Sequence, residues 1–151
     1  MNGFLLDTDV ISMLSPSRPE VSAGFLDWLE AVDREGRLFL SIVSIHEIEK
    51  GIALLDHKGA TAKAAGLTMW LAGLVSTYGD RIIGVDIATA ALAGRLEAKA
   101  IAAGHDPGMA DAIIAGIAKA HDLHIVTRNT KHFLPFGSSV SSPEAGGLPR
   151  S

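Results

Sequence analysis

The stretch FLLDTDV, residues 4–10, carries an aspartate directly after a short apolar run, and similar arrangements recur along the chain. SIVSIHEIEKG contributes Glu47, DPGMADAIIAG contributes Asp111, and HIVTRNTKHF contributes Asn129. In an open α/β sheet, residues just beyond the carboxyl ends of parallel strands converge on one crevice. An all-oxygen set of ligands suits Mg²⁺, with Mn²⁺ as a second possible ion. The sequence therefore predicts a divalent-metal site at Asp7, Glu47, Asp111 and Asn129.

The composition is that of a single globular domain. The chain has 151 residues, of which 48% are hydrophobic, and it contains no cysteine. Disulfides and thiolate zinc sites are therefore excluded, and a cytoplasmic location is expected. No apolar run reaches the roughly 18 residues that span a bilayer. Asp7 and Asp9 interrupt the first apolar stretch, which therefore does not resemble a secretion signal.

The charge balance argues against avid, nonspecific binding of nucleic acid. There are 13 basic and 17 acidic residues, which gives a net charge of −4. A nuclease remains compatible with this balance, because a bound metal ion reverses the local charge that a phosphate meets. Arg128 and Lys131 are the candidate substrate-binding residues beside the acidic positions.

Alternating strand and helix patterns predict an α/β fold with a mostly parallel sheet. Strands are expected at Gly3–Asp7, Leu38–Ser41, Arg81–Val85 and His124–Thr127, with a short additional strand near Val140. Helices are expected at Thr8–Leu14, Glu20–Asp33, Ser44–Leu55, Ala60–Tyr78 and Ile87–Ala103, and from Pro107, in a first turn, to His121. The break at Ser15-Pro16-Ser17-Arg18-Pro19 ends the first helix.

Each acidic position also has a structural interpretation. Asp7 fits a helix N-cap, Ser44 and Glu47 fit a capping box, and Asn129 fits a turn. Asp111 is different, because it lies beyond the better cap candidate Asp106 and has no basic residue three or four positions away. A carboxylate buried there requires a cation. The coincidence of several such positions favours a functional site.

The segments LLDTDVIS, LSIVSIHEIEKGIALL and HDPGMADAIIAGIAKAHDLHIVTRNTKHF resemble the PIN-domain ribonuclease family. The resemblance is strongest to VapC-like and FitB-like toxins of prokaryotic type II toxin–antitoxin pairs, and it covers residues 4–133. It implies a three-layer α/β/α domain with four or five strands over residues 1–135. Residues 136–151, rich in Ser, Gly and Pro, would form a tail that is mobile apart from one short strand.

The resemblance also implies roles for individual residues. Asp7, Glu47 and Asp111 match the family's metal-binding and catalytic acids. Asn129 stands where many relatives carry a fourth acid, and Asp9 stands where the family usually has Asn. Thr8 and Thr127 lie beside the cluster and would orient ligands or water, unless they are ordinary turn residues.

The activity that the resemblance implies is metal-dependent endonucleolytic cleavage of RNA. One or two Mg²⁺ or Mn²⁺ ions would bind the scissile phosphate and lower the pKa of a water molecule. The products would carry 5′-phosphate and 3′-hydroxyl ends, and tRNA, rRNA and mRNA are the possible targets.

Two alternative functions remain open from the sequence. In a haloacid-dehalogenase-type phosphatase, Asp7 would be the nucleophile and Asp9 the acid/base, but the chain lacks the DxDGT continuation. The other alternative is a noncatalytic PIN-like module that binds RNA or protein. A zinc site at His121 and His124 is disfavoured by their spacing.

The partners implied by the resemblance are an RNA substrate, a cognate antitoxin and a second copy of the chain. The antitoxin would place a helical segment in a groove and a basic side chain in the acidic site. Apolar faces of the helices expected at Glu20–Asp33 and Ala60–Tyr78 are candidate surfaces for it. Operator DNA would be reached only through the antitoxin.

Overall fold

The computed structural model describes residues 1–16, 21–144 and 148–149. These residues form an all-parallel sheet of five strands in the order β3-β2-β1-β4-β5. The strands are β1 (Gly3–Leu6), β2 (Leu38–Ser41), β3 (Ile82–Ile83), β4 (Leu123–Val126) and β5 (Val140–Ser141). The expectation of an α/β fold with a mostly parallel sheet is therefore confirmed.

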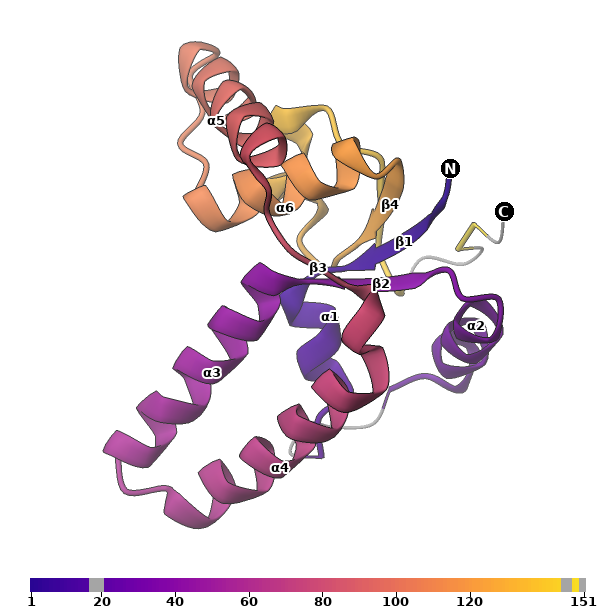
Figure 1. The fold of residues 1–151 in the computed structure, drawn as a ribbon, viewed down its shortest axis with the longest axis vertical. Coiled ribbons are helices and arrows are strands. Elements are labelled where there is room, and N and C mark those ends of the chain that lie inside the picture. The colour runs from indigo at the N-terminus through magenta and orange to yellow at the C-terminus, as the bar shows by residue number, and fades with distance from the viewer. Residues whose placement is uncertain (17–20, 145–147, 150–151) are drawn as a thin grey trace.

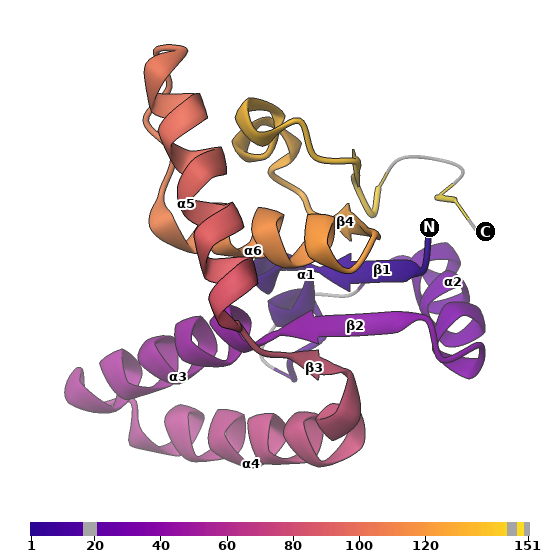
Figure 2. The ribbon, with the colours of Figure 1, turned by 45° about the horizontal axis from the view of Figure 1, so that its top comes forward.

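Helices cover both faces of the sheet and give the three layers that were expected. Four helices lie on one side, namely α1 (Thr8–Met13), α2 (Ala23–Arg34), α3 (Ile42–His57) and α4 (Thr61–Tyr78) (Figure 1). The other side is covered by α5 (Ile87–Ala102) and α6 (Met109–Ala120) (Figure 2). Helices α3 and α4 run side by side as a hairpin that extends away from the sheet.

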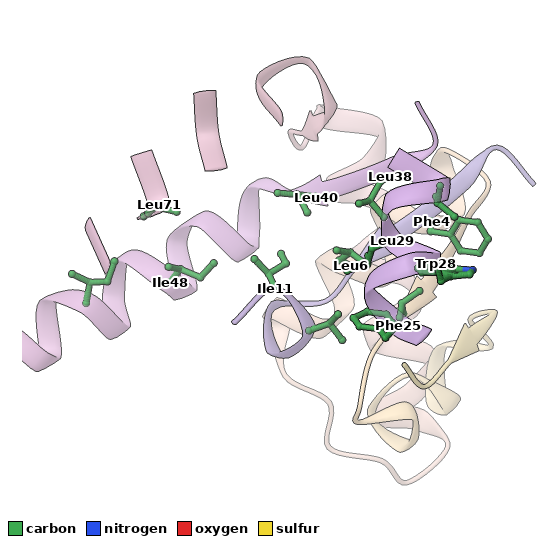
Figure 3. Close-up of a cluster of buried hydrophobic side chains, with 14 of the residues drawn as sticks. Phe4, Leu6, Ile11, Phe25, Trp28, Leu29, Leu38, Leu40, Ile48 and Leu71 are labelled. Carbon is green, nitrogen blue, oxygen red and sulfur yellow. The ribbon is translucent and has the colours of Figure 1, made fainter. Parts of the chain in front are cut away.

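The central strand β1 is buried on both faces, which explains its uninterrupted apolar sequence. Phe4 and Leu6 point into the cluster beneath α1–α4, whereas Leu5 points into the cluster beneath α5 and α6. Figure 3 shows the first cluster, in which Trp28 contacts Phe4 edge to face at 4.8 Å between ring centroids. Parallel strands become this apolar only when helices cover both faces of the sheet.

Several helices begin at residues other than those predicted, and α3 and α6 show the reason most clearly. Helix α3 begins at Ile42, because the side chain of Ser41 accepts hydrogen bonds from the amides of Val43 and Ser44. The predicted start at Ser44 is therefore wrong. Helix α6 has Gly108 as its N-cap, without a side-chain cap. Pro107 thus precedes the helix instead of occupying its first turn, and Asp106 is not its cap.

The predicted helix Glu20–Asp33 is α2, but its N-cap is Ser22. In the predicted break at residues 15–19, Ser15 and Pro16 are described and lie beyond the end of α1. Residues 17–19 and Glu20 lie outside the described residues. The apolar face of α2 is made of Phe25, Trp28, Leu29 and Val32, all of which are buried in the core. This face is therefore not available as a docking surface, and the expectation that it would bind the antitoxin is wrong.

The C-terminal segment returns to the sheet. Strand β5 pairs with β4, and the ring nitrogens of His124 are 2.5 and 2.7 Å from the hydroxyls of Ser139 and Ser141. Serine hydroxyls thus occupy both ring nitrogens of His124, and burial lowers the pKa of this ring. Pro149 accepts a hydrogen bond from the indole of Trp28 at 3.1 Å. Residues 145–147 and 150–151, part of the tail expected to be mobile, lie outside the description.

Among the helices described, none combines the length and the apolar character needed to cross a membrane.

Candidate active site

The acidic residues lie at the point in the sheet where the order of the strands changes direction. From β1 the chain runs outward to β2 and β3, and it then returns to β4 on the other side of β1. The carboxyl ends of β1 and β4 therefore border a topological switch point, where open α/β sheets bind ligands. Asp7 follows β1, and Thr127 follows β4.

Asp7 is buried at the centre of the site, with 7% of its surface exposed. It is the N-cap of α1, since its Oδ1 accepts from the amide of Thr8 at 2.8 Å. Its Oδ2 accepts from the hydroxyl of Thr127 at 2.8 Å. Burial raises the pKa of Asp7 to about 6, and the negative charges of Asp9 and Asp111 act in the same direction against these hydrogen bonds. The capping role and a place in the acidic cluster thus coexist.

Glu47 reaches the site from the second turn of α3. Its Oε1 accepts a hydrogen bond from the hydroxyl of Thr8 at 2.5 Å, and that hydroxyl lies 2.8 Å from Oγ of Ser44. Because Ser41 caps α3, Glu47 does not form the capping box that its spacing from Ser44 allowed. Thr8 instead ties Glu47 to the residue that follows Asp7. The buried hydroxyl of Ser44 was not expected here, although its position three residues before Glu47 places it on the same helix face.

Asp111 lies in the first turn of α6, where the positive end of the helix dipole favours a carboxylate. Its Oδ2 is 3.6 Å from Nδ1 of His132. Partial burial raises the pKa of Asp111; His132 opposes this shift, whereas Glu47 and Asp9 reinforce it. These mutual effects mean that the four carboxylates share one electrostatic environment. His132 was not predicted as a site residue, because the turn that follows Asn129 determines where this ring lies.

Asp9 and Asn129 are joined to each other. The amide nitrogen of Asn129 donates to Oδ2 of Asp9 at 3.0 Å, and the backbone amide of Arg128 donates to the same oxygen at 3.1 Å. The side chain of Arg128 also approaches this oxygen, with Nε at 3.7 Å. Asn129 thus lies at the rim of the cluster, against Asp9.

Two depressions flank the acidic cluster. One, of about 330 Å³, borders Asp111 and carries Lys131, His132 and His105 on its walls. The other, of about 370 Å³, runs from Thr8 and Glu47 between α3 and α4, and it includes Leu67, Trp70 and Lys63. The cluster is therefore reached from a partly basic side and from a side that is lined by polar and apolar residues in similar measure.

The donors fit a hard divalent cation held with few direct protein ligands. All candidate donors are oxygens, and the raised pKa values of Asp7 and Asp111 reflect carboxylates that a cation would stabilise. Within the described ranges, no three Asp, Glu or His side chains stand close enough to hold an ion as they are. Mg²⁺ commonly keeps several waters and uses only one or two carboxylates together with substrate phosphates, so this spacing is compatible with it.

Comparison with known proteins places the chain in a family. Residues 4–134 match the PIN domain family model. The plasmid stability protein StbB of Pseudomonas syringae pv. tomato is 36% identical over 140 residues, covering 92% of this chain and 96% of that protein. Toxin FitB of Neisseria gonorrhoeae is 31% identical over 140 residues, with the same coverage of both chains.

Solved structures agree with the sequence comparison. The crystal structure of FitAcB from Neisseria gonorrhoeae superposes with a TM-score of 0.79 at 31% identity, covering 93% of this chain and 97% of that chain. The structure of FitAB bound to an IR36 DNA fragment gives a TM-score of 0.71 at 28% identity, covering 96% and 98%. On the strength of the family match, the shared architecture and the identity with these relatives, the chain belongs to the PIN-domain family.

Proposed function

We propose that this protein is a divalent-metal-dependent endoribonuclease and acts as the toxin of a prokaryotic toxin–antitoxin pair. The observation that carries the proposal is the electrostatic coupling of Asp111 with both Asp7 and Glu47 beside the switch point, with the pKa values of both aspartates raised. Similarity to toxin FitB supports the toxin role. The fold contains no membrane-spanning helix in its described part, and we propose a cytoplasmic location.

In the proposed reaction, water adds to phosphorus while the bond from phosphorus to the 3′ oxygen breaks. The 3′ oxygen takes up a proton, which leaves 3′-hydroxyl and 5′-phosphate ends. A bound Mg²⁺ or Mn²⁺ ion would neutralise phosphate charge and activate the water. Asp7, Glu47 and Asp111 would hold the ion, with Asn129 as a weaker ligand. Thr127 orients Asp7, and Thr8 orients Glu47, through the hydrogen bonds described above.

The RNA would approach along the side of the cluster that carries basic groups. Lys131 borders the depression beside Asp111, and Arg128 adjoins Asp9 at the rim. Both side chains are long enough to contact phosphates that flank the scissile one, and such contacts add affinity without reading sequence.

Purified, antitoxin-free protein incubated with total RNA tests this function directly. We expect discrete cleavage with Mg²⁺ or Mn²⁺, no cleavage with EDTA, and fragment ends of the two kinds stated above. Folded protein that cuts no RNA with either ion would instead favour the noncatalytic RNA- or protein-binding alternative. The phosphatase alternative gains no support from the family match, and hydrolysis of small phosphomonoesters would be the observation that revived it.

The groove between α3 and α4 is the proposed site of the antitoxin. It is lined by apolar residues such as Leu67 and Trp70, and it opens at Glu47, where a basic side chain of the antitoxin would be attracted. The sequence suggested the apolar faces of α2 and α4 as docking surfaces, and of these two the face of α4 lines this groove. DNA is present in the solved FitAB complex, and we propose that this acidic chain reaches operator DNA only through its antitoxin.

A homodimer is proposed from the outer surface of α3 and the start of α5. Ile42 is 46% exposed and Ile87 is 90% exposed, although both are large and apolar. A shallow apolar depression on α3 includes Ile42, Ile45 and Ala53. Burying such side chains against a second copy removes apolar surface from water. Light scattering of the purified protein tests this proposal.

Replacing Asn129 with aspartate is expected to strengthen divalent-ion binding. In Asn129→Asp the amide that donates to Asp9 becomes a carboxylate about 3 Å from another, so the metal-free protein should lose thermal stability. A divalent cation relieves this repulsion, so the stabilisation by Mn²⁺ and its calorimetric affinity should both increase.

The double variant Asp9→Asn with Asn129→Asp is the matched control for that experiment. It restores a carboxylate–amide pair with the roles exchanged, and it should recover the metal-free stability. Unaltered or weaker Mn²⁺ affinity in Asn129→Asp would mean that residue 129 lies outside the metal site.

A further inference from the structure

Asp9 is connected to one short segment of the chain by several hydrogen bonds. Its Oδ2 accepts from the backbone amide of Arg128 at 3.1 Å and from Nδ2 of Asn129 at 3.0 Å. Its Oδ1 lies 3.4 Å from the hydroxyl of Thr127. Asp9 belongs to the first turn of α1, so these contacts join residues that are 118 to 120 positions apart.

The segment 127–129 has few other attachments. Strand β4 ends at Val126, and the amide of Thr127 still bonds to the carbonyl of Ser141. Beyond that point, within the part of the chain that the structure describes, the amide of Arg128 bonds to Asp9 and the amide of Asn129 bonds back to the hydroxyl of Thr127. The carbonyl of Asn129 accepts from the amide of His132. The path of the chain as it leaves the sheet therefore depends on the carboxylate of Asp9.

This path determines two features of the site. The hydroxyl of Thr127 is directed at Oδ2 of Asp7, at 2.8 Å, and so fixes the central carboxylate. Nδ2 of Asn129 is committed to Asp9, which leaves the amide oxygen as the atom that Asn129 can offer to a cation. The contacts of Asp9 thus help to orient both Asp7 and Asn129 as candidate ligands.

We propose that Asp9 is a positioning residue that holds residues 127–129 over the acidic cluster by accepting hydrogen bonds, and not through its charge or by proton transfer. The proposal rests on the function proposed above for its relevance to cleavage. The anchoring itself is a property of the metal-free protein and is tested separately.

Two substitutions separate geometry from charge. In Asp9→Asn the side-chain oxygen can take the place of Oδ2 and accept from Arg128 and Asn129, so both shorter bonds survive without the charge. Asp9→Glu keeps the charge but moves the oxygens by about one carbon–carbon bond, so the two bonds to one oxygen are lost. Asp9→Ala removes acceptor and charge together.

The experiment measures amide hydrogen exchange at Arg128 in metal-free protein by NMR, together with calorimetric Mn²⁺ affinity. We expect Asp9→Asn to remain within about threefold of the wild type in both measurements. In Asp9→Glu and Asp9→Ala we expect exchange at Arg128 to accelerate at least tenfold. We also expect Mn²⁺ affinity to fall by about 10–100-fold, the range for residues that orient ligands.

The possible outcomes divide clearly. If Asp9→Asn loses as much Mn²⁺ affinity as Asp9→Ala while Asp9→Glu retains it, charge is what matters and the proposal is wrong. Unchanged exchange at Arg128 in all three variants would show that Asp9 anchors nothing. A wild-type protein without nuclease activity would overturn the proposed function but would leave the exchange result interpretable.

Asp9→Asn is also expected to keep RNA cleavage within about tenfold of the wild-type rate, whereas a general acid–base role predicts a loss of roughly 10²–10⁴-fold.

Discussion

Asp111→Asn is expected to reduce metal-dependent RNA cleavage by on the order of 10²-fold or more, while the fold is preserved. The substitution removes the charge of a proposed metal ligand but changes the side-chain volume very little. The first turn of α6 tolerates an amide at this position, because among the described residues the carboxylate contacts no polar side chain other than His132, at 3.6 Å. Initial cleavage rates on a defined RNA at saturating Mg²⁺ measure the effect.

The control for this prediction is Asp56→Asn, which also removes one negative charge but lies in the last part of α3 and is exposed. It should cleave RNA at the wild-type rate. Circular dichroism and thermal unfolding establish that both variants are folded. Wild-type cleavage by Asp111→Asn at saturating Mg²⁺ would remove Asp111 from the site.

Asp7→Asn should stabilise the metal-free protein at neutral pH even though it removes the central carboxylate. The pKa of Asp7 is about 6 in the folded protein, above the ordinary value of 3.8, so charging this residue is harder in the folded state. The contribution of Asp7 to the free energy of unfolding is therefore fully present below pH 3.8, and it is lost as the pH rises through about 6. At about 1.4 kcal/mol per pH unit, the cost approaches 3 kcal/mol, and structural relaxation reduces it to about 1–3 kcal/mol.

Urea unfolding in EDTA at several pH values tests this prediction. Asp7→Asn should exceed the wild type by about 1–3 kcal/mol at pH 7.5, and the difference should shrink towards zero near pH 4. Asp27→Asn, at an exposed position of α2, should show no such trend. A pH-independent difference would mean that the amide acts through packing and not through the charge of Asp7.

The element order and most helix positions followed from hydrophobic periodicity, because both faces of this sheet are covered and each layer repeats its apolar pattern. Strand β2 matches its expected range, and Asp86 caps α5 by accepting from the amide of Thr89. The start of α6 was not predictable in this way. A glycine N-cap leaves no side-chain signal, so Asp106 and Pro107 looked like better choices.

The residues that gather at the site were less predictable than the fold. Asp7, Glu47 and Asp111 stand out because acids next to apolar strands and helices need a reason to be there. The partners of these acids depend on contacts between distant segments. The bond from Thr8 to Glu47 and the approach of His132 to Asp111 arise only when α1, α3 and α6 meet, and no local pattern encodes that meeting.

The position of β1 between β2 and β4 also has a consequence during synthesis of the chain. An emerging polypeptide presents Asp7 and Glu47 early, but β1 lacks its second neighbour until Leu123–Val126 has been made. Asp111 and the segment that anchors to Asp9 arrive in the same late part. A chain whose translation stops before α6 therefore carries Asp7, Asp9 and Glu47 on an unfinished sheet and lacks Asp111. The proposed nuclease site therefore cannot be assembled until α6 and β4 have been made.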